Sequence, residues 1–148
     1  MLHKDAGDVD LGHRSLQCGR RNDALKLWLA WKERGDEGWS KQVDRYIADA
    51  DYMEEQVHAH PRLEMMSTRK YANVCMRYNP TPGVDDDKLN DLNAKIRQAL
   101  QDTGRFMISR SNIGKHVILR PVTSHPGLTR KVLDDLLAEI VKIGDSLQ

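Results

Sequence analysis

The sequence predicts an α+β fold in which helices cover a small, mostly antiparallel sheet. From about residue 60 onward, the expected elements follow the order strand, strand, helix, strand, strand, helix. The expected helices in this region each carry one apolar stripe, which packing against a sheet would bury. The expected strands are short and are separated by turn-forming Gly, Pro, Asn and Ser residues. Together these observations favour a two-layer domain preceded by a helical region.

The composition limits what the protein can be. The chain has 148 residues, of which 39% are hydrophobic and 30% charged, and its net charge is +1. This balance gives no electrostatic reason to expect a nucleic-acid or membrane surface, and the longest apolar run, 27–31, is far too short to span a bilayer. Residues 1–14 lack the apolar centre of a signal peptide, and two cysteines make no disulfide framework. We therefore expect a cytoplasmic protein.

The first predicted helix is apolar on nearly every side. Asn22 suits the N-cap position, and Gly35 suits the position after the last turn. Its apolar residues are Ala24, Leu25, Leu27, Trp28, Leu29, Ala30 and Trp31. Such a helix is normally buried on more than one side, which the predicted sheet alone cannot achieve. We therefore expect one of two sets to be exposed or covered by self-association. The sets are Leu25, Trp28 and Leu29, or Leu27 and Trp31.

The other elements follow from periodicity and from turn-forming residues. Apolar spacings of three and four predict helices, and alternation predicts strands. Residues 1–16 are polar and predict an irregular entry segment. Loops are expected at 79–83, 111–114 and 124–127. The remaining predicted helices span about 37–59, 86–103 and 128–143, and the predicted strands span 63–66, 72–78, 106–109 and 116–123.

Two groups of residues raise the question of a metal site. His58 and His60 are two residues apart, so they do not share a helix face, and no further ligand completes a set at suitable spacing. The acidic run 85–87 precedes a helix, where the helix dipole favours carboxylates. It also lacks the alternating ligands and central glycine of a calcium loop. We expect no metal site.

The two cysteines differ in their surroundings. Cys75 lies between Val74 and Met76 in a predicted strand, which predicts a buried and inert thiol. Cys18 lies just before two arginines and a helix N-terminus, and such surroundings favour the reactive thiolate. However, no histidine is identifiable as its base. An enzyme that depends on a thiol or a metal remains a third possibility on these weak signals.

Arg120 is the candidate binding residue. It interrupts a strand, 117–122, that is otherwise nearly all apolar, and a cation there must pair with an anion or reach solvent. One interpretation is a structural ion pair or an edge-strand arginine that extends outward. The other is a carboxylate clamp, because guanidinium binds carboxylate through two parallel hydrogen bonds. The residues alone leave both interpretations open.

Several segments resemble one enzyme family. SLQCGRRNDALKLWLAWKERGDEGW, at 15–39, resembles the segment that opens the C-terminal part of the pyridoxal-phosphate-dependent group II amino-acid decarboxylases. The similarity is greatest to the glutamate and cysteine sulfinate decarboxylase branch. YANVCMRYNP (71–80), KHVILRPVTSHPGLT (115–129) and LDDLLAEIVKIGDSLQ (133–148) resemble its strand and Pro loop, its arginine-bearing strand and its last helix. The resemblance covers nearly the whole chain.

The resemblance implies the small C-terminal domain of a fold-type-I pyridoxal-phosphate enzyme. Residues 1–36 would be a remnant of the catalytic loop and a connecting helix, and 37–148 the small α/β domain. In the family, the Schiff-base lysine belongs to the large domain, so we expect no catalytic residue in this chain. The pair His3-Lys4 imitates the family's His-Lys motif, but it lies only 13 residues before Gln17, where the family has a much longer interval.

The resemblance also carries two site residues over to this sequence. Arg120 matches the arginine that contacts an acidic group of the substrate or product. Gly19 matches a position near the cofactor phosphate across the dimer interface, where glycine allows close backbone approach. An aligned arginine also occurs in the branch that acts on aromatic amino acids. Arg120 therefore does not by itself establish an acidic substrate.

The function implied is that of the C-terminal portion of a pyridoxal 5'-phosphate-dependent decarboxylase. Its substrate would be glutamate, cysteine sulfinate or aspartate, and its partners would be a large N-terminal domain and a second subunit of a homodimer. No nucleic acid or membrane is expected as a partner. We expect the 148-residue chain alone to be inactive. The alternative is a stand-alone interaction or regulatory module that retains the small-domain fold.

Overall fold

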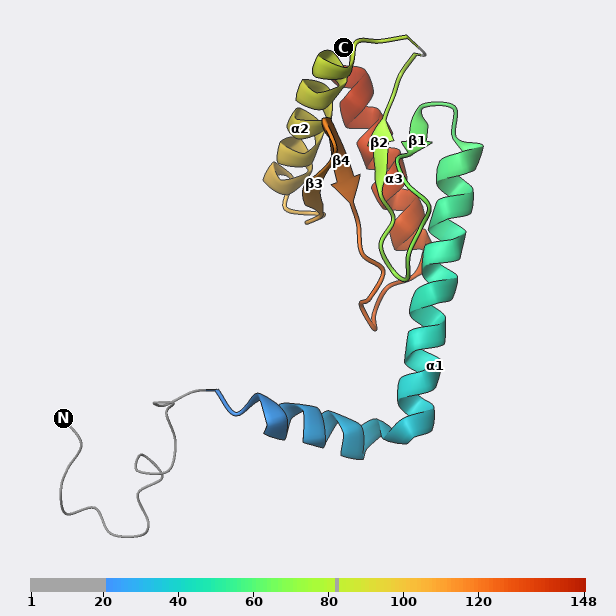
Figure 1. The fold of residues 1–148 in the computed structure, drawn as a ribbon, viewed down its shortest axis with the longest axis vertical. Coiled ribbons are helices and arrows are strands. Elements are labelled where there is room, and N and C mark those ends of the chain that lie inside the picture. The colour runs from blue at the N-terminus through green and yellow to red at the C-terminus, as the bar shows by residue number, and fades with distance from the viewer. Residues whose placement is uncertain (1–20, 82) are drawn as a thin grey trace, which may run out of the picture. The chain divides into compact units, whose positions relative to one another are not determined.

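The computed structural model describes residues 21–81 and 83–148, and this part of the chain contains three helices and one four-stranded antiparallel sheet (Figure 1). The strand order is β1-β2-β4-β3. The predicted α+β fold is therefore confirmed. The elements are α1 (Asp23–Ala59), β1 (Leu63–Met65), β2 (Met76–Tyr78), α2 (Asp86–Asp102), β3 (Ser109–Ile113), β4 (His116–Arg120) and α3 (Arg130–Ser146).

The chain divides between Trp39 and Ser40 into two compact units, the first of which is described from Arg21 onward. The expected domain boundary between 1–36 and 37–148 stays a prediction. Within the described residues, no helix is both long enough and apolar enough to cross a membrane.

Helix α1 spans the residues of both helices that the sequence predicts before residue 60. Asn22 is the N-cap, since its Oδ1 accepts a hydrogen bond from the Leu25 N–H at 3.1 Å. Gly35 interrupts the helical conformation with φ 64° and ψ −179°, a region that essentially only glycine occupies. Beside this interruption, the Trp31 indole N–H donates to Asp36 at 2.6 Å, and the rings of Trp31 and Trp39 lie 5.8 Å apart.

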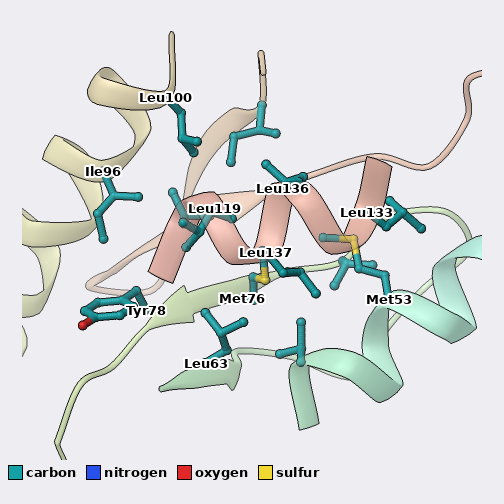
Figure 2. Packing of buried hydrophobic residues seen from close by; sticks show 14 of the residues in the cluster. Met53, Leu63, Met76, Tyr78, Ile96, Leu100, Leu119, Leu133, Leu136 and Leu137 are labelled. Carbon is teal, nitrogen blue, oxygen red and sulfur yellow. The ribbon is translucent and has the colours of Figure 1, made fainter. Parts of the chain in front are cut away.

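The core of the second unit lies between one face of the sheet and helices that come from three parts of the chain. Figure 2 shows Met53 of α1, Ile96 of α2 and Leu136 of α3 gathered around Met76 and Leu119 of the sheet. The buried residues of this core are Ala50, Met53, Val57, Leu63, Val74, Met76, Tyr78, Ile96, Leu100, Ile108, Leu119, Leu133, Leu136, Leu137, Ile140 and Ile143. The fold thus buries most of the apolar stripes predicted for these helices, but Val43 of α1 and Val132 of α3 are exposed.

The β2–β4 pairing is shorter than the predicted strands 72–78 and 116–123. Its register pairs Met76 with Leu119, and an isolated bridge between Asn73 and Val122 continues the same register. Between these pairs, the Val74 N–H donates to the Pro121 carbonyl, but proline has no N–H with which to return the bond. Pro121 therefore interrupts a ladder that the alternating sequence predicts as continuous.

The β3–β4 hairpin corrects two predictions. The strand expected at 106–109 lies instead at Ser109–Ile113, and the turn expected at 111–114 lies at Gly114 and Lys115. Ser111 and Asn112 are turn-forming residues, but β3 is an edge strand, and an edge strand tolerates polar residues on both faces. Gly114, with φ 57°, supplies the positive φ that a two-residue hairpin turn requires.

Helices α2 and α3 begin at capping side chains. The Asp85 carboxylate accepts from the N–H groups of Asp87 and Lys88, which confirms a structural role for this part of the acidic run. The Thr129 hydroxyl accepts from the Val132 N–H, so α3 begins at Arg130, two residues later than predicted. The helix continues to Ser146, three residues beyond the predicted end, and its last turn includes the buried Gly144.

Candidate functional site

The sheet face opposite the core carries Arg120. Side chains alternate along a strand, so Leu119 points into the core and Arg120 points to the other face. Arg120 is the last residue of β4 and is exposed. Among the described residues, no hydrogen bond or ion pair involves its guanidinium. The structural ion pair that the sequence left open for Arg120 is therefore absent from the described part of the chain.

Two neighbours flank Arg120 in the same row of the sheet. Ser109 of β3 is its direct pairing partner. On the other side, the β2–β4 register that pairs Met76 with Leu119 puts Cys75 opposite Arg120. Residues directly opposite each other point to the same face, so this row presents a thiol, a guanidinium and a hydroxyl.

A second arginine, Arg77, lies on the same face but is already neutralised. Its Nε donates to Glu64 at 2.9 Å, its Nη1 donates to Asp86 at 3.1 Å, and only 10% of its side chain is exposed. Burial disfavours the cation, yet the hydrogen bonds to Glu64 and Asp86 outweigh it and raise the pKa of Arg77. Sequence reasoning missed this residue, although the alternation along 72–78 puts Arg77 on the polar side.

Asp86, the first residue of α2, connects this network to the hairpin. Its carboxylate contacts Lys115 at 2.9 Å and His116 at 3.3 Å as well as Arg77. Hydrogen bonds from Lys115 and Arg77 lower the pKa of Asp86 to about 2. Part of the acidic run 85–87 thus holds α2 against β2 and the β3–β4 turn. Of the two arginines on this face, only Arg120 remains available to an external anion.

The other candidate residues have structural surroundings or lie outside the described residues. His58 lies 4.0 Å from Glu54, and His60 Nδ1 accepts from the Arg62 N–H. Residues 21–81 and 83–148 contain no cluster of three groups that could hold a metal. Cys75 is a free thiol that is half-buried, and therefore less enclosed than predicted. Gly19, Cys18 and the pair His3-Lys4 lie outside the described residues.

The first half of α1 exposes its apolar side chains. Exposure was one of the two outcomes expected from the sequence, and self-association was the other. Both predicted sets are exposed rather than one. Exposure is between 47% and 58% for Leu25, Leu27, Trp28, Leu29 and Trp31. Scattered apolar residues are normal on a surface, but five within seven positions form a patch of the kind that marks an interface.

A model of the pyridoxal-dependent decarboxylase conserved domain matches residues 2–79. Acidic amino acid decarboxylase GADL1 from Bos taurus is 31% identical over 147 residues, covering 93% of this chain and 28% of the relative. Human cysteine sulfinic acid decarboxylase is 29% identical, covering 94% of this chain and 30% of the relative. The chain therefore spans less than a third of the length of these relatives.

Solved structures show the same fold. Mouse CSAD in apo form superposes with a TM-score of 0.82 at 28% identity, covering 91% of this chain and 30% of that one. Oryza sativa TDC with PLP and tryptamine superposes with a TM-score of 0.77 at 22% identity, covering 93% of this chain and 30% of the other. The second likeness concerns the fold alone.

Proposed function

This chain belongs to the pyridoxal-dependent decarboxylase family, and on that premise we propose that it is the C-terminal portion of an enzyme that removes the α-carboxylate of an acidic amino acid. The observation that carries this proposal is Arg120, an exposed guanidinium with no partner among the described residues. Relatives whose names specify acidic substrates cover nearly all of the chain. Glutamate, cysteine sulfinate and aspartate are the substrates we consider.

Arg120 would bind and orient the substrate. Its guanidinium can donate two parallel hydrogen bonds to a carboxylate or sulfinate group, which fixes both the position and the direction of that group. Holding the distal acid in one place restricts how the α-carbon can be presented for decarboxylation. An analogue without the acidic group would leave the guanidinium unpaired in the closed enzyme, and this would select for acidic substrates.

Pyridoxal phosphate is the cofactor of the family, and when bound it supplies the electron sink for decarboxylation. The cavity at the first half of α2 does not fit it. This cavity of about 350 Å³ contains Lys88 and Lys95, but it has no aromatic side chain to stack on a pyridine ring, and Lys95 pairs with Asp91 at 2.7 Å. We therefore propose that a large domain holds the cofactor and its Schiff-base lysine, with Gly19 near the phosphate.

The exposed apolar patch supports the proposed large domain and homodimer partner. Residues 1–36 would form the catalytic-loop remnant and the connecting helix, and 37–148 the small domain. The five exposed apolar residues of α1 would pack against the large domain or the second subunit, which would remove their surface from water. The free thiol of Cys75 suits the cytoplasmic location that we propose for the enzyme.

The test is decarboxylation by the protein encoded by the complete reading frame that contains this chain. Carbon dioxide release is measured with glutamate, aspartate, cysteine sulfinate and an aromatic amino acid. We expect an acidic substrate to be preferred, and preference for the aromatic amino acid would contradict the proposal. The alternative, a stand-alone interaction module, requires that this reading frame encode no upstream large domain.

A second experiment concerns the chain alone. The purified 148-residue chain is incubated with pyridoxal phosphate, reduced with borohydride and analysed by mass spectrometry. We expect no stable site-specific lysine adduct and no release of carbon dioxide from any of the substrates. A stoichiometric adduct on Lys4 together with decarboxylation would contradict the proposal that the catalytic lysine lies in a large domain.

A further inference from the structure

We propose that the Ser109 hydroxyl is a second donor to the acidic group that Arg120 binds. This inference rests on the proposed function, because it assumes that Arg120 receives the acid of the substrate. It adds a residue that determines specificity, and it follows from the register of the β3–β4 hairpin rather than from the arginine itself.

The hairpin fixes Ser109 beside Arg120. β3 and β4 pair without a bulge from Ile113 and His116, next to the two-residue turn, as far as Ser109 and Arg120. A one-residue slip would turn every side chain of β3 to the opposite face, so this register decides which hydroxyl accompanies the guanidinium. Directly opposite residues have Cβ atoms roughly 5 Å apart, which is within the reach of one shared small anion.

The face is open at this row and closed at the next. One row along the sheet, Ile118 is 1% exposed and Arg77 is held by Glu64 and Asp86. In the row of Arg120, both Arg120 and Ser109 are exposed. An anion that reaches this face therefore finds one available guanidinium, and the exposed hydroxyl beside it is that of Ser109.

The Ser109 hydroxyl is available for this role. In the described residues, no hydrogen bond involves its Oγ. A serine hydroxyl rotates to suit its acceptor and carries one O–H donor. A carboxylate or sulfinate that accepts two bonds from guanidinium keeps further lone pairs, and one of these can accept from Ser109. The thiol of Cys75, on the other side of Arg120, is only a weak donor.

The experiment uses the isotopically labelled full chain and glutarate as the probe, at constant pH and ionic strength. Saturable changes in the NMR shifts of the Arg120 Nε–H and the Ser109 amide report binding. We expect Ser109→Ala to weaken glutarate binding about fivefold, the usual effect of losing one hydrogen bond. Ser109→Thr keeps the hydroxyl and should restore most of the affinity.

Ser111→Ala is the matched control. Ser111 lies on the same strand and the same face, but it pairs with the apolar Ile118, so its loss should leave the affinity unchanged. Arg120→Gln should abolish saturable binding. Equal affinities for the wild type and Ser109→Ala, with binding still lost in Arg120→Gln, would overturn the inference and leave the role of Arg120 standing. If glutarate gives the wild type no saturable shifts, both the inference and the proposed anion site at Arg120 fail.

Discussion

The side-chain amide of Asn93 takes the place of a strand beside Tyr78. Its Oδ1 accepts the Tyr78 N–H at 2.8 Å, and its Nδ2 donates to the Tyr78 carbonyl at 2.9 Å. In the β2–β4 register, Tyr78 would next pair with Val117, but the Val117 N–H donates instead to Asn90 Oδ1 at 2.7 Å. Two amides of α2 thus satisfy the backbone where the strands separate.

This relationship predicts the cost of removing Asn93. Asn93→Ala leaves a buried N–H and a buried carbonyl of Tyr78 without partners, so we expect a loss of about 2–4 kcal/mol in the free energy of unfolding. Urea denaturation measures it. Asn90→Ala, at a less buried position of the same helix, should cost about 1 kcal/mol. Equal losses for the two variants would contradict the interpretation.

The two arginines on the sheet face opposite the core, Arg77 and Arg120, should differ in their effect on folding. Arg77→Gln breaks two ion pairs of a nearly buried side chain, and we expect it to lower the free energy of unfolding by about 2–3 kcal/mol. Arg120→Gln removes no described partner, so its effect should stay within about 0.5 kcal/mol. Urea denaturation of both variants makes the comparison. A large loss for Arg120→Gln would favour a structural role for Arg120.

Gly144 allows α3 to approach the ring of Tyr78. A Cβ atom at position 144 would lie 2.7 Å from ring carbons, closer than real contacts allow. We expect Gly144→Ala to cost about 1–3 kcal/mol through overpacking, although alanine is the better helix former. Lys142→Ala, an exposed change on the same helix, is the control and should stay within about 0.5 kcal/mol. A stabilising Gly144→Ala would show that the ring moves aside without cost.

Asp86 should contribute to the acid sensitivity of the fold. Hydrogen bonds from Lys115 and Arg77 lower its pKa from 3.8 to about 2 in the folded state, so the folded state favours the ionised carboxylate. The resulting stabilisation is present above about pH 4 and is lost as the pH falls from 3.8 towards 2. In Asp86→Asn, the urea midpoint should fall less steeply over this range than in the wild type.

Asp87→Asn is the control for this pH dependence. Asp87 is exposed and follows Asp86 directly, but no described ion pair involves it. Its variant should keep the acid-induced fall of the wild type. The interpretation is wrong if Asp86→Asn and Asp87→Asn give the same pH profile.

The apolar patch of α1 should drive self-association of the isolated chain. Sedimentation velocity should show species larger than a monomer as the concentration rises, and Leu27→Glu or Leu29→Glu should reduce them. Lys26→Gln, a polar change on the same segment, should have little effect. A monomer at high concentration whose tryptophans are all shielded from quencher would contradict this prediction.

Most of the fold could be predicted from the sequence because the helices and inner strands carry clear periods. The apolar stripes of α2 and α3 located both helices, and the caps Asp85 and Thr129 fix their starts in the structure. β3 could not be located this way, because an exposed edge strand needs no apolar alternation. The sequence also could not show that the predicted strands 72–78 and 116–123 are interrupted. Pro121 interrupts the ladder because it lies opposite Val74, and that pairing is known only from the structure.

The candidate site was predictable in part. Arg120 stood out because it is a cation within an apolar strand, and its type alone raises the question of an anion. Arg77 and Ser109 did not stand out in the sequence, because the role of each depends on residues from other elements that lie beside it in the fold. Which hydroxyl lies beside Arg120 depends on the β3–β4 register. A turn at 111–114, as the sequence predicts, would give a different register from the observed turn at Gly114 and Lys115.

The proline after Arg120 marks a change in how the strand is paired. The β3–β4 pairing ends at Arg120, but the chain beyond it stays paired with the β2 side, because the Val74 N–H donates to the Pro121 carbonyl and the Thr123 N–H donates to the Ala72 carbonyl. Thr123 is also fully buried, and its hydroxyl donates to the Tyr46 carbonyl. The backbone is therefore held both before and after Arg120, and adjustment to a ligand falls to the rotatable bonds of the arginine side chain.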